Sequence, residues 1–393
     1  MAVAVLLTAR QLGAAEFGVY SAGFASAGLT SILFNLGLDT WLLRSAARDA
    51  ASVKPLLSNA VAVKLLVGLP WLIGIVVLLP WLNPETFRAQ LVLFSALAVW
   101  MEGLLMLGLA VFKASLQNRV TASLLIGARG GVLLFTVLLM AAHSRQALHY
   151  AEARLLVSVV ILLVTLLLLP TRPGKSTWTA LKQTAQVSLP FALSDLFTSI
   201  YVQADTTIAA IALTKEAVGF YAPSESLINA LFAIPNAGYS VMVPVLVRLV
   251  ETGRRSLNRV MTLTIAGFAA MGLVLWVGTW YISSALPIWI LGNSFRESGP
   301  LLTILSPIIF LKSCSFAAAA ILVAVGWQQR RMYVQAVSAI ANVALNLAVI
   351  YRFGITGVAV VYVISEVLLT VGYMGWVVLW ARQSGDRPEQ RSK

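Results

Sequence analysis

The chain has 393 residues, of which 59% are hydrophobic and only 11% are charged, and its net charge is +13. Soluble domains are usually about 45–50% apolar and about 25% charged, so this composition excludes a soluble enzyme, a nucleic-acid-binding domain and a large extramembrane head. The single cysteine, Cys314, excludes an internal disulfide framework and a cysteine-rich metal site. Because a spanning helix needs about 20 apolar residues, the length accommodates about a dozen spans with short loops.

Apolar runs separated by short polar breaks predict the membrane spans. The first run, Met1–Ala9, is too short to cross a hydrocarbon core of about 30 Å at about 1.5 Å per residue. We expect it to be the outer half of a first span that begins before this chain, followed by a turn at Arg10–Gly18. Eleven full spans are predicted after it, at 19–43, 56–82, 91–112, 120–142, 148–170, 187–212, 220–247, 259–284, 299–325, 332–351 and 356–380.

Lysine and arginine gather in every second break, which predicts the orientation. The positive-inside rule places the richer set in the cytoplasm, where it faces anionic lipid and not nucleic acid. The alternation also supports the number of spans, because one wrong span would scramble it. The cytoplasmic set is Arg44, Arg48, Lys54, Lys113, Arg119, Arg172, Lys175, Lys182, Arg248, Arg254, Arg255, Arg259, Arg330, Arg331, Arg382, Arg387, Arg391 and Lys393, and the outer set is Arg10, Arg88, Arg145, Lys215, Arg296 and Arg352.

The longest internal break divides the chain into two halves. It is basic and contains Pro173 and Gly174. A short repeat supports the division, since Gly18 and Tyr20 recur as Gly219 and Tyr221, where the alternative is chance similarity between two turns. Parallel repeats of this kind are typical of transporters. The predicted parts are an N-terminal bundle at 1–170, a cytoplasmic linker at 171–186, a C-terminal bundle at 187–381 and a basic cytoplasmic tail at 382–393.

Several runs of residues resemble a known family. The sequences LLTARQLGAAEFGVYSAGF and NLGLDTWLLRSAAR, near the start of the chain, resemble the opening of the polysaccharide transporter family. These are the oligosaccharide flippases within the multidrug/oligosaccharidyl-lipid/polysaccharide exporter superfamily. The resemblance covers nearly the whole chain, and the later segments that carry it are Asp205 with 217–222, Pro244–Arg248, and Asn342 with Tyr351–Gly357.

The resemblance implies both a fold and a function. The fold is an all-α membrane protein with two pseudo-symmetric bundles of six helices, the first helix being incomplete here. The function is transport of undecaprenyl-pyrophosphate-linked oligosaccharides across the bacterial inner membrane, for lipopolysaccharide, capsule or exopolysaccharide. The expected partners are this substrate, membrane lipids, a polysaccharide polymerase and a chain-length regulator, without a nucleic acid. No cofactor is expected, although a proton or sodium gradient could drive transport.

Basic residues inside predicted spans are candidates for substrate binding, because charges in a membrane are costly. Arg129 and Lys312 lie mid-span, and both residue types suit phosphate groups facing a central cavity. The alternative is an ion pair with a buried acid such as Glu102 or Glu366.

Two further basic residues inside predicted spans point less clearly to substrate binding. Lys64 is predicted near the cytoplasmic end of its span, where its ammonium group can reach the interface. Arg154, early in its span, fits either interpretation. The substrate-binding candidates are therefore Arg129, Lys312, Lys64 and Arg154.

Acidic residues and prolines predict ion coupling and gating. Asp195 and Asp205 belong to a polar stripe on 187–212, and Glu225 belongs to one on 220–247. A buried carboxyl group can exchange protons, and carboxylates can also hold Na⁺. Pro190, Pro223, Pro235 and Pro244 fall in the same two spans, so they fit moving gates, although proline is also tolerated in membrane helices. The candidates are Asp195, Asp205, Glu225, Glu102, Glu366 and Pro235.

The remaining polar residues favour structural roles, and two other functions stay open. Amides on 332–351, including Asn342 and Asn346, are predicted to join helices. His143 and His149 are predicted in a solvated outer turn without metal-ligand spacing. The alternative functions are a cation-coupled exporter of small amphipathic compounds and, ranked last for want of a large outer domain, a glycan polymerase or glycosyltransferase. We predict a transporter and not an enzyme.

Overall fold

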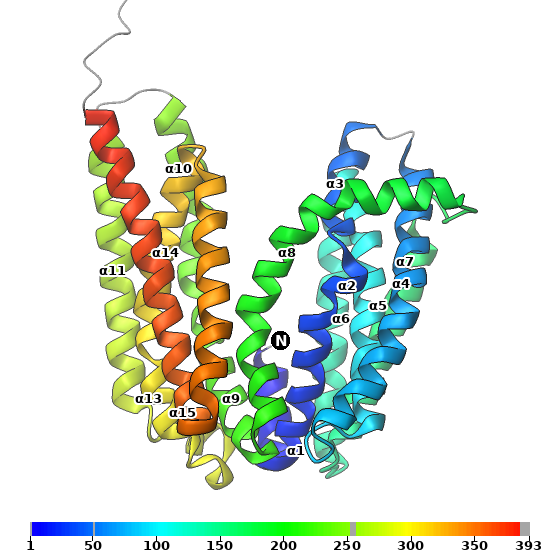
Figure 1. Ribbon diagram of the computed structural model, residues 1–393, viewed down its shortest axis with the longest axis horizontal. Coiled ribbons are helices and arrows are strands. Elements are labelled where there is room, and N and C mark those ends of the chain that lie inside the picture. The colour runs from blue at the N-terminus through cyan, green and yellow to red at the C-terminus, as the bar shows by residue number, and fades with distance from the viewer. Residues whose placement is uncertain (1, 50–51, 252–256, 386–393) are drawn as a thin grey trace, which may run out of the picture. The chain divides into compact units, whose positions relative to one another are not determined.

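The computed structural model describes residues 2–49, 52–251 and 257–385, and this part of the chain is helical without strands (Figure 1). Nine of its helical segments are long and apolar enough to cross a membrane. Two of the nine contain a non-helical glycine, Gly13 or Gly354, with positive φ. Because glycine adopts positive φ without steric cost, each segment is divided into two helices there. The predicted turns at 10–18 and after Tyr351 are thereby confirmed.

Residues 3–222 form the first of two compact units. Helix α5 lies at its centre and packs against α3, α4, α6 and α7, while α8 packs against α3 and α4. The buried core is apolar, with Leu38, Leu57, Leu107 and Phe112 at its centre. The helices are α1 (Ala2–Thr30), α2 (Ile32–Asn35), α3 (Leu38–Arg48), α4 (Val53–Leu82), α5 (Ala89–Ala114), α6 (Asn118–Ala141), α7 (Ala147–Leu168) and α8 (Trp178–Ala212), followed by the start of α9 (Lys215–Leu231).

One predicted span of this unit, at 19–43, is not a continuous helix, so this prediction was wrong. Residues 19–43 are interrupted after Thr30 and again at Leu36 and Gly37, which both have positive φ. A Cβ atom on Gly37 would overlap the backbone of α8 at Phe191 and Ala192. The close approach of α8 therefore requires glycine at the second break.

The described residues from Pro223 onward form the second unit. Helix α14 is its centre and packs against α10, α11 and α15. The helices after α9 are α10 (Ala233–Glu251), α11 (Leu257–Ile282), α12 (Leu286–Leu291), α13 (Ser298–Leu305), α14 (Pro307–Ala324) and α15 (Gln328–Gly385), with a short 3₁₀ turn η2 (Asn293–Phe295) before α13.

Two predicted spans of the second unit are also interrupted, and a proline accompanies each break. The 220–247 span ends at Leu231 and resumes at Ala233, just before Pro235. The proline ring clashes with the carbonyl group four residues earlier, which belongs to Leu231. The 299–325 span is divided at Ser306, directly before Pro307.

The repeated glycines of the two halves meet in the first unit. A Cβ atom on Gly18 of α1 would overlap the carbonyl oxygen of Lys215, and one on Gly219 of α9 would overlap that of Ala14. In the repeat, Ala14 corresponds to Lys215 and Gly18 to Gly219. Each contact is therefore the counterpart of the other, as a two-fold relation between the copies requires.

Some predictions concern residues that the structure does not describe. Arg254 and Arg255 lie outside the described residues, as do Arg387, Arg391 and Lys393 of the predicted tail.

The division of the chain at 171–186 falls within the described residues and stays a prediction.

Candidate functional site

A buried lysine and an aspartate link α4 to α3 in the first unit. Lys64 Nζ lies 2.7 Å from Asp39 Oδ1, and the Lys64 side chain is fully buried. It also donates a hydrogen bond to the carbonyl oxygen of Gly103 at 2.7 Å. Because α4 begins at Val53, Lys64 lies about three turns inside the helix. The prediction that its ammonium group reaches the interface was therefore wrong.

A third charged residue joins this pair from α8. Asp195, which is half-buried, interacts electrostatically with both Asp39 and Lys64. We call these three residues the acidic cluster. With two carboxylates and one ammonium group, it carries a formal negative charge when all three are ionised, which suits a proton or a metal cation.

Helices α5 and α7 are joined by an arginine–glutamate pair. Arg154 Nε lies 2.9 Å from Glu102 Oε1, and its Nη2 donates to Oε2 at 3.1 Å. The guanidinium also covers the Phe24 ring, 4.1 Å from its centroid. Such a two-point pair fixes the orientation of both side chains.

Arg129 of α6 acts electrostatically on the same carboxylate. We call Arg129, Glu102 and Arg154 the basic cluster, because two guanidiniums face one carboxylate. Arg129 is exposed, and it stands at the middle of α6 (Asn118–Ala141). An exposed cation halfway along a spanning helix is costly against lipid, so this position suits an aqueous path or an anionic ligand.

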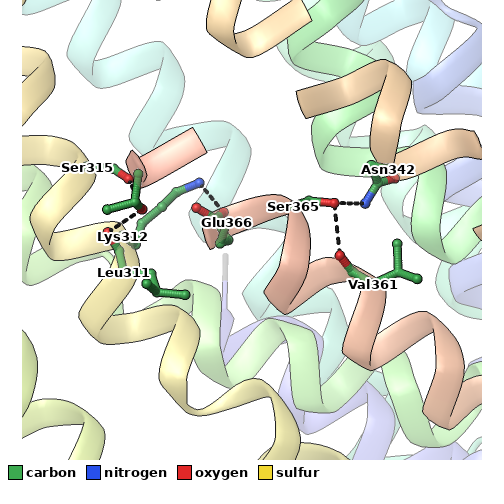
Figure 2. Close-up of polar contacts among 8 residues, drawn as sticks. Leu311, Lys312, Ser315, Asn342, Val361, Ser365 and Glu366 are labelled. Atoms are coloured by element: carbon green, nitrogen blue, oxygen red, sulfur yellow. Dashed lines mark hydrogen bonds and ion pairs between the residues drawn. The ribbon is translucent and has the colours of Figure 1, made fainter. Parts of the chain in front are cut away.

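The second unit contains a buried lysine–glutamate pair, which Figure 2 shows. Lys312 Nζ of α14 lies 2.7 Å from Glu366 Oε1, on the part of α15 after Gly354, and the Glu366 side chain is fully buried. The Oε2 atom of Glu366 has no hydrogen-bond partner among the described residues. The predicted alternative for Lys312, an ion pair with Glu366, is confirmed.

Hydrogen bonds continue from this pair between neighbouring helices. Ser315 bonds Thr370 at 2.7 Å. Asn342 donates to Ser365 at 3.1 Å (Figure 2). The Asn342 bond joins the two parts of α15. The prediction that the amides of 332–351 join helices is confirmed for Asn342.

The Arg154–Glu102 and Lys312–Glu366 pairs occupy equivalent helices in the predicted order of spans, with the positions of acid and base exchanged. In the predicted order of spans, α5 and α7 are the fourth and sixth, while α14 and the second part of α15 are the tenth and twelfth. The acid lies on the fourth span in the first half, whereas the base lies on the tenth in the second. In the predicted order of spans, an ion pair therefore joins the fourth span to the sixth and the tenth to the twelfth, half-buried in the first case and mostly buried in the second.

The other predicted acids have different surroundings. Asp205 is buried and accepts a hydrogen bond from Tyr221 Oη at 3.3 Å. Glu225 is half-buried on α9.

The helix break that precedes the predicted gating proline lies near the buried pair of the second unit. Pro235 is in the first turn of α10, and Phe232 is the residue between α9 and α10. The Phe232 ring centroid lies 5.5 Å from Lys312 Nζ. A change in the angle between α9 and α10 would therefore alter the surroundings of Lys312.

The candidates predicted from the sequence did not include Asp39, Phe24 or Tyr221, although Tyr221 belongs to the repeat. Asp39 lies inside a predicted span and could have been found, because an ionisable residue there is a candidate by default. Phe24 and Tyr221 carry no such signal, since aromatic residues are common in apolar helices. His143 and His149 are exposed as predicted, and His149 Nδ1 bonds Ser144 at 2.7 Å.

Comparisons with known proteins identify the family. A model of the polysaccharide biosynthesis protein family matches residues 7–300. No curated protein matches the chain. The family match covers well over half of the chain.

Solved transporters share the fold. An inward-facing multidrug resistance MATE family transporter of the MOP superfamily has a TM-score of 0.79 at 14% identity, covering 98% of this chain and 95% of its own. The lipid II flippase MurJ, in an inward closed conformation, has a TM-score of 0.78 at 11% identity, covering 96% and 86%. An outward-facing MATE transporter reaches 0.57 at 14% identity, covering 98% and 97%.

These similarities confirm the all-α membrane fold and the resemblance inferred from sequence. The chain belongs to the polysaccharide biosynthesis protein family and has the fold of the MOP-superfamily transporters.

Proposed function

We propose that this protein is a flippase for undecaprenyl-pyrophosphate-linked oligosaccharides. It would move them from the cytoplasmic to the outer face of the bacterial inner membrane by alternating access, for surface polysaccharide. The family match supports a role in polysaccharide biosynthesis, and the fold shared with a lipid flippase fits a lipid-linked substrate. A polymerase and a chain-length regulator are the proposed protein partners.

The position of Arg129 is the observation that best supports an anionic substrate. Lys64 and Lys312 are each within 2.7 Å of an acid, so their charges are balanced inside the protein. The basic cluster retains a formal positive charge, and its Arg129 is exposed midway along α6. Because arginine binds phosphate oxygens through two parallel N–H groups, we assign the pyrophosphate to Arg129.

The acidic cluster is the proposed site of ion coupling. Asp195 is half-buried and adjoins the Lys64–Asp39 pair. Binding of a proton or Na⁺ at Asp195 would cancel the excess negative charge and change how strongly α8 is held to α3 and α4. Glu366 is the corresponding candidate in the second unit, because one of its buried oxygens lacks a hydrogen bond in the described part of the chain.

A deletion tests the function in cells. In a strain without a paralogue, loss of the gene should trap lipid-linked oligosaccharides in the cytoplasmic leaflet and remove the surface glycan. The unmodified gene should restore the glycan, whereas an Arg129→Gln gene should not. Normal surface glycan in the deletion strain would refute the proposal.

A cation-coupled exporter of small amphipathic compounds is the second candidate, favoured by the similarity to MATE transporters. It predicts dye efflux that falls in Asp195→Asn and Asp205→Asn variants. The basic cluster argues against cationic compounds, because like charges repel. Unchanged efflux in both variants would eliminate this candidate.

A further inference from the structure

An apolar groove lies between α10 and α11 in the second unit. Its volume is about 660 Å³, and its lining includes Gly238 and Val241 from α10 with Leu263, Gly267 and Phe268 from α11. Thr264 is the one lining residue with a polar side chain, and its hydroxyl donates to the carbonyl oxygen of Val260 at 2.8 Å. The groove therefore offers an apolar surface.

The rims of the groove carry exposed apolar side chains. Both helices belong to segments that are long and apolar enough to cross a membrane. On its rims, Val241 is 64% exposed and Leu263 is 61% exposed. Large exposed apolar side chains on spanning helices are stable when they contact apolar chains.

Glycine creates the depth of the groove. Gly238 lies against the Phe268 ring, and a Cβ atom on Gly267 would meet nothing within 4 Å. A side chain at Gly267 would therefore enter the groove without displacing protein atoms. The groove, about 660 Å³ between two helices, can hold part of one apolar chain.

Two arginines lie toward one end of the groove. Arg259 directly precedes the lining residue Val260, and Arg248 follows the lining residue Met242 by less than two helical turns. Both side chains are exposed, and both belong to a break that the positive-inside rule places in the cytoplasm. The groove therefore combines an apolar length with a cationic cytoplasmic end.

We propose that this groove binds the polyprenyl chain of the lipid-linked substrate when it enters from the cytoplasmic leaflet, with Arg248 and Arg259 contacting the pyrophosphate at this first step and Arg129 contacting it at a later one. This inference rests on the proposed function and adds where the lipid part is held. The charge at the cytoplasmic end matches an anionic head group, and the apolar length matches its chain.

The test is photo-crosslinking of the full-length protein in nanodiscs. The probe is a polyprenyl pyrophosphate with a diazirine on its prenyl chain. The labelled residues should lie on α10 and α11 around Val241 and Leu263. Excess undecaprenyl pyrophosphate should remove the label, and phosphatidylglycerol should not. Label spread evenly over the lipid-facing helices, or equal displacement by phosphatidylglycerol, would overturn the proposal.

A matched pair of variants tests the groove itself. Gly267→Leu should reduce groove labelling at least about tenfold, since that corresponds to losing about 1.4 kcal/mol of binding. Gly278→Leu is the control, because Gly278 lies three turns further along the same face of α11 and is equally open. It should label normally, and an equal loss in both variants would contradict the proposal.

The arginines and the transport assay complete the design. An Arg248→Gln, Arg259→Gln double variant should bind the pyrophosphate probe more weakly than the unmodified protein does, but should bind a neutral polyprenol probe equally. Unaltered pyrophosphate binding would remove the assignment of the arginines. Flipping in proteoliposomes is measured separately: intact flipping with an unlabelled groove refutes this inference alone, whereas a labelled groove without flipping refutes the proposed function.

Discussion

At the scale of single residues, opposite charges account for three basic side chains inside helices. Lys64, Arg154 and Lys312 each lie within 2.9 Å of a carboxylate oxygen. A buried charge is expensive without a partner, and removing one member of a buried pair typically costs about 3–5 kcal/mol. These pairs therefore hold helices together within each unit. Arg129 shares Glu102 with Arg154, and its exposure midway along α6 is what makes it the proposed contact for the substrate.

The Lys312–Glu366 pair predicts a strong coupling between its two members. Lys312→Met and Glu366→Gln should each destabilise the protein by about 3–5 kcal/mol, because each leaves a buried charge without its partner. The double variant should recover much of the loss. Thermal unfolding in detergent measures all four proteins, and simple additivity of the two losses would show that the pair is not coupled.

Arg129 predicts a loss of transport without a loss of stability. Arg129→Gln should slow flipping at least about tenfold, which corresponds to about 1.4 kcal/mol in the barrier. Arg129→Lys should be intermediate, since lysine keeps the charge but loses the two-point geometry. Because Arg129 is exposed, its stability should change by no more than about 0.5 kcal/mol.

The control for this prediction lies on the same helix. Arg119 is also exposed, close to the start of α6. Arg119→Gln should leave the rate of flipping unchanged. If both variants slow flipping equally, the effect belongs to the general positive charge of α6 and not to Arg129.

At the scale of helices, a proline follows the break between α9 and α10, and two glycines allow the backbones of α1 and α9 to approach closely. The α9–α10 break at Phe232 precedes Pro235, and the ring of Phe232 lies 5.5 Å from the Lys312 ammonium nitrogen. The α1–α9 crossing depends on glycine, because its two glycines contact backbone carbonyls. Substitutions at the α9–α10 break and at the α1–α9 crossing test these two roles.

Pro235→Ala should join α9 and α10 into one straighter helix. Alanine restores the backbone N–H and removes the clash with Leu231, so helix formation there becomes easier. We expect unchanged or higher thermal stability together with slower transport. Unchanged transport at unchanged stability would show that the break has no role in gating.

Gly18→Ala and Gly219→Ala should both disrupt the α1–α9 crossing. Each adds a Cβ atom against a backbone carbonyl, which cannot rotate away as a flexible side chain can. Overpacking of this kind typically costs about 1–3 kcal/mol. Gly130→Ala, at an open helical position, is the control, and equal melting temperatures for all three variants would contradict the close crossing.

At the scale of the whole molecule, composition and charge alternation were sufficient to predict an all-helical membrane protein. The predicted spans agree with the helices to within a few residues at α5 and α6, because long apolar runs leave few alternatives. The breaks at Gly37 and Phe232 were not predictable. They depend on the approach of α8 and on a proline effect that single sequences also show in continuous helices.

The partners of the charged residues were less predictable than their positions. Lys312 and Glu366 were both candidates, and their pairing was one of two interpretations. Arg154 was expected in either role, and its pairing with Glu102 depends on the packing of α5 on α7. Hydropathy shows how far along a spanning helix a charged residue lies. Only tertiary packing decides which side chain of a neighbouring helix it contacts.

Flipping of an undecaprenyl-pyrophosphate-linked oligosaccharide by the purified protein in proteoliposomes tests the central claim most directly. A fluorescent glycan on the lipid reports its leaflet through accessibility to a quencher. We predict that the protein equilibrates the lipid between leaflets and that Arg129→Gln protein does so at least about tenfold more slowly. Equal rates in protein-containing and protein-free vesicles would contradict the account.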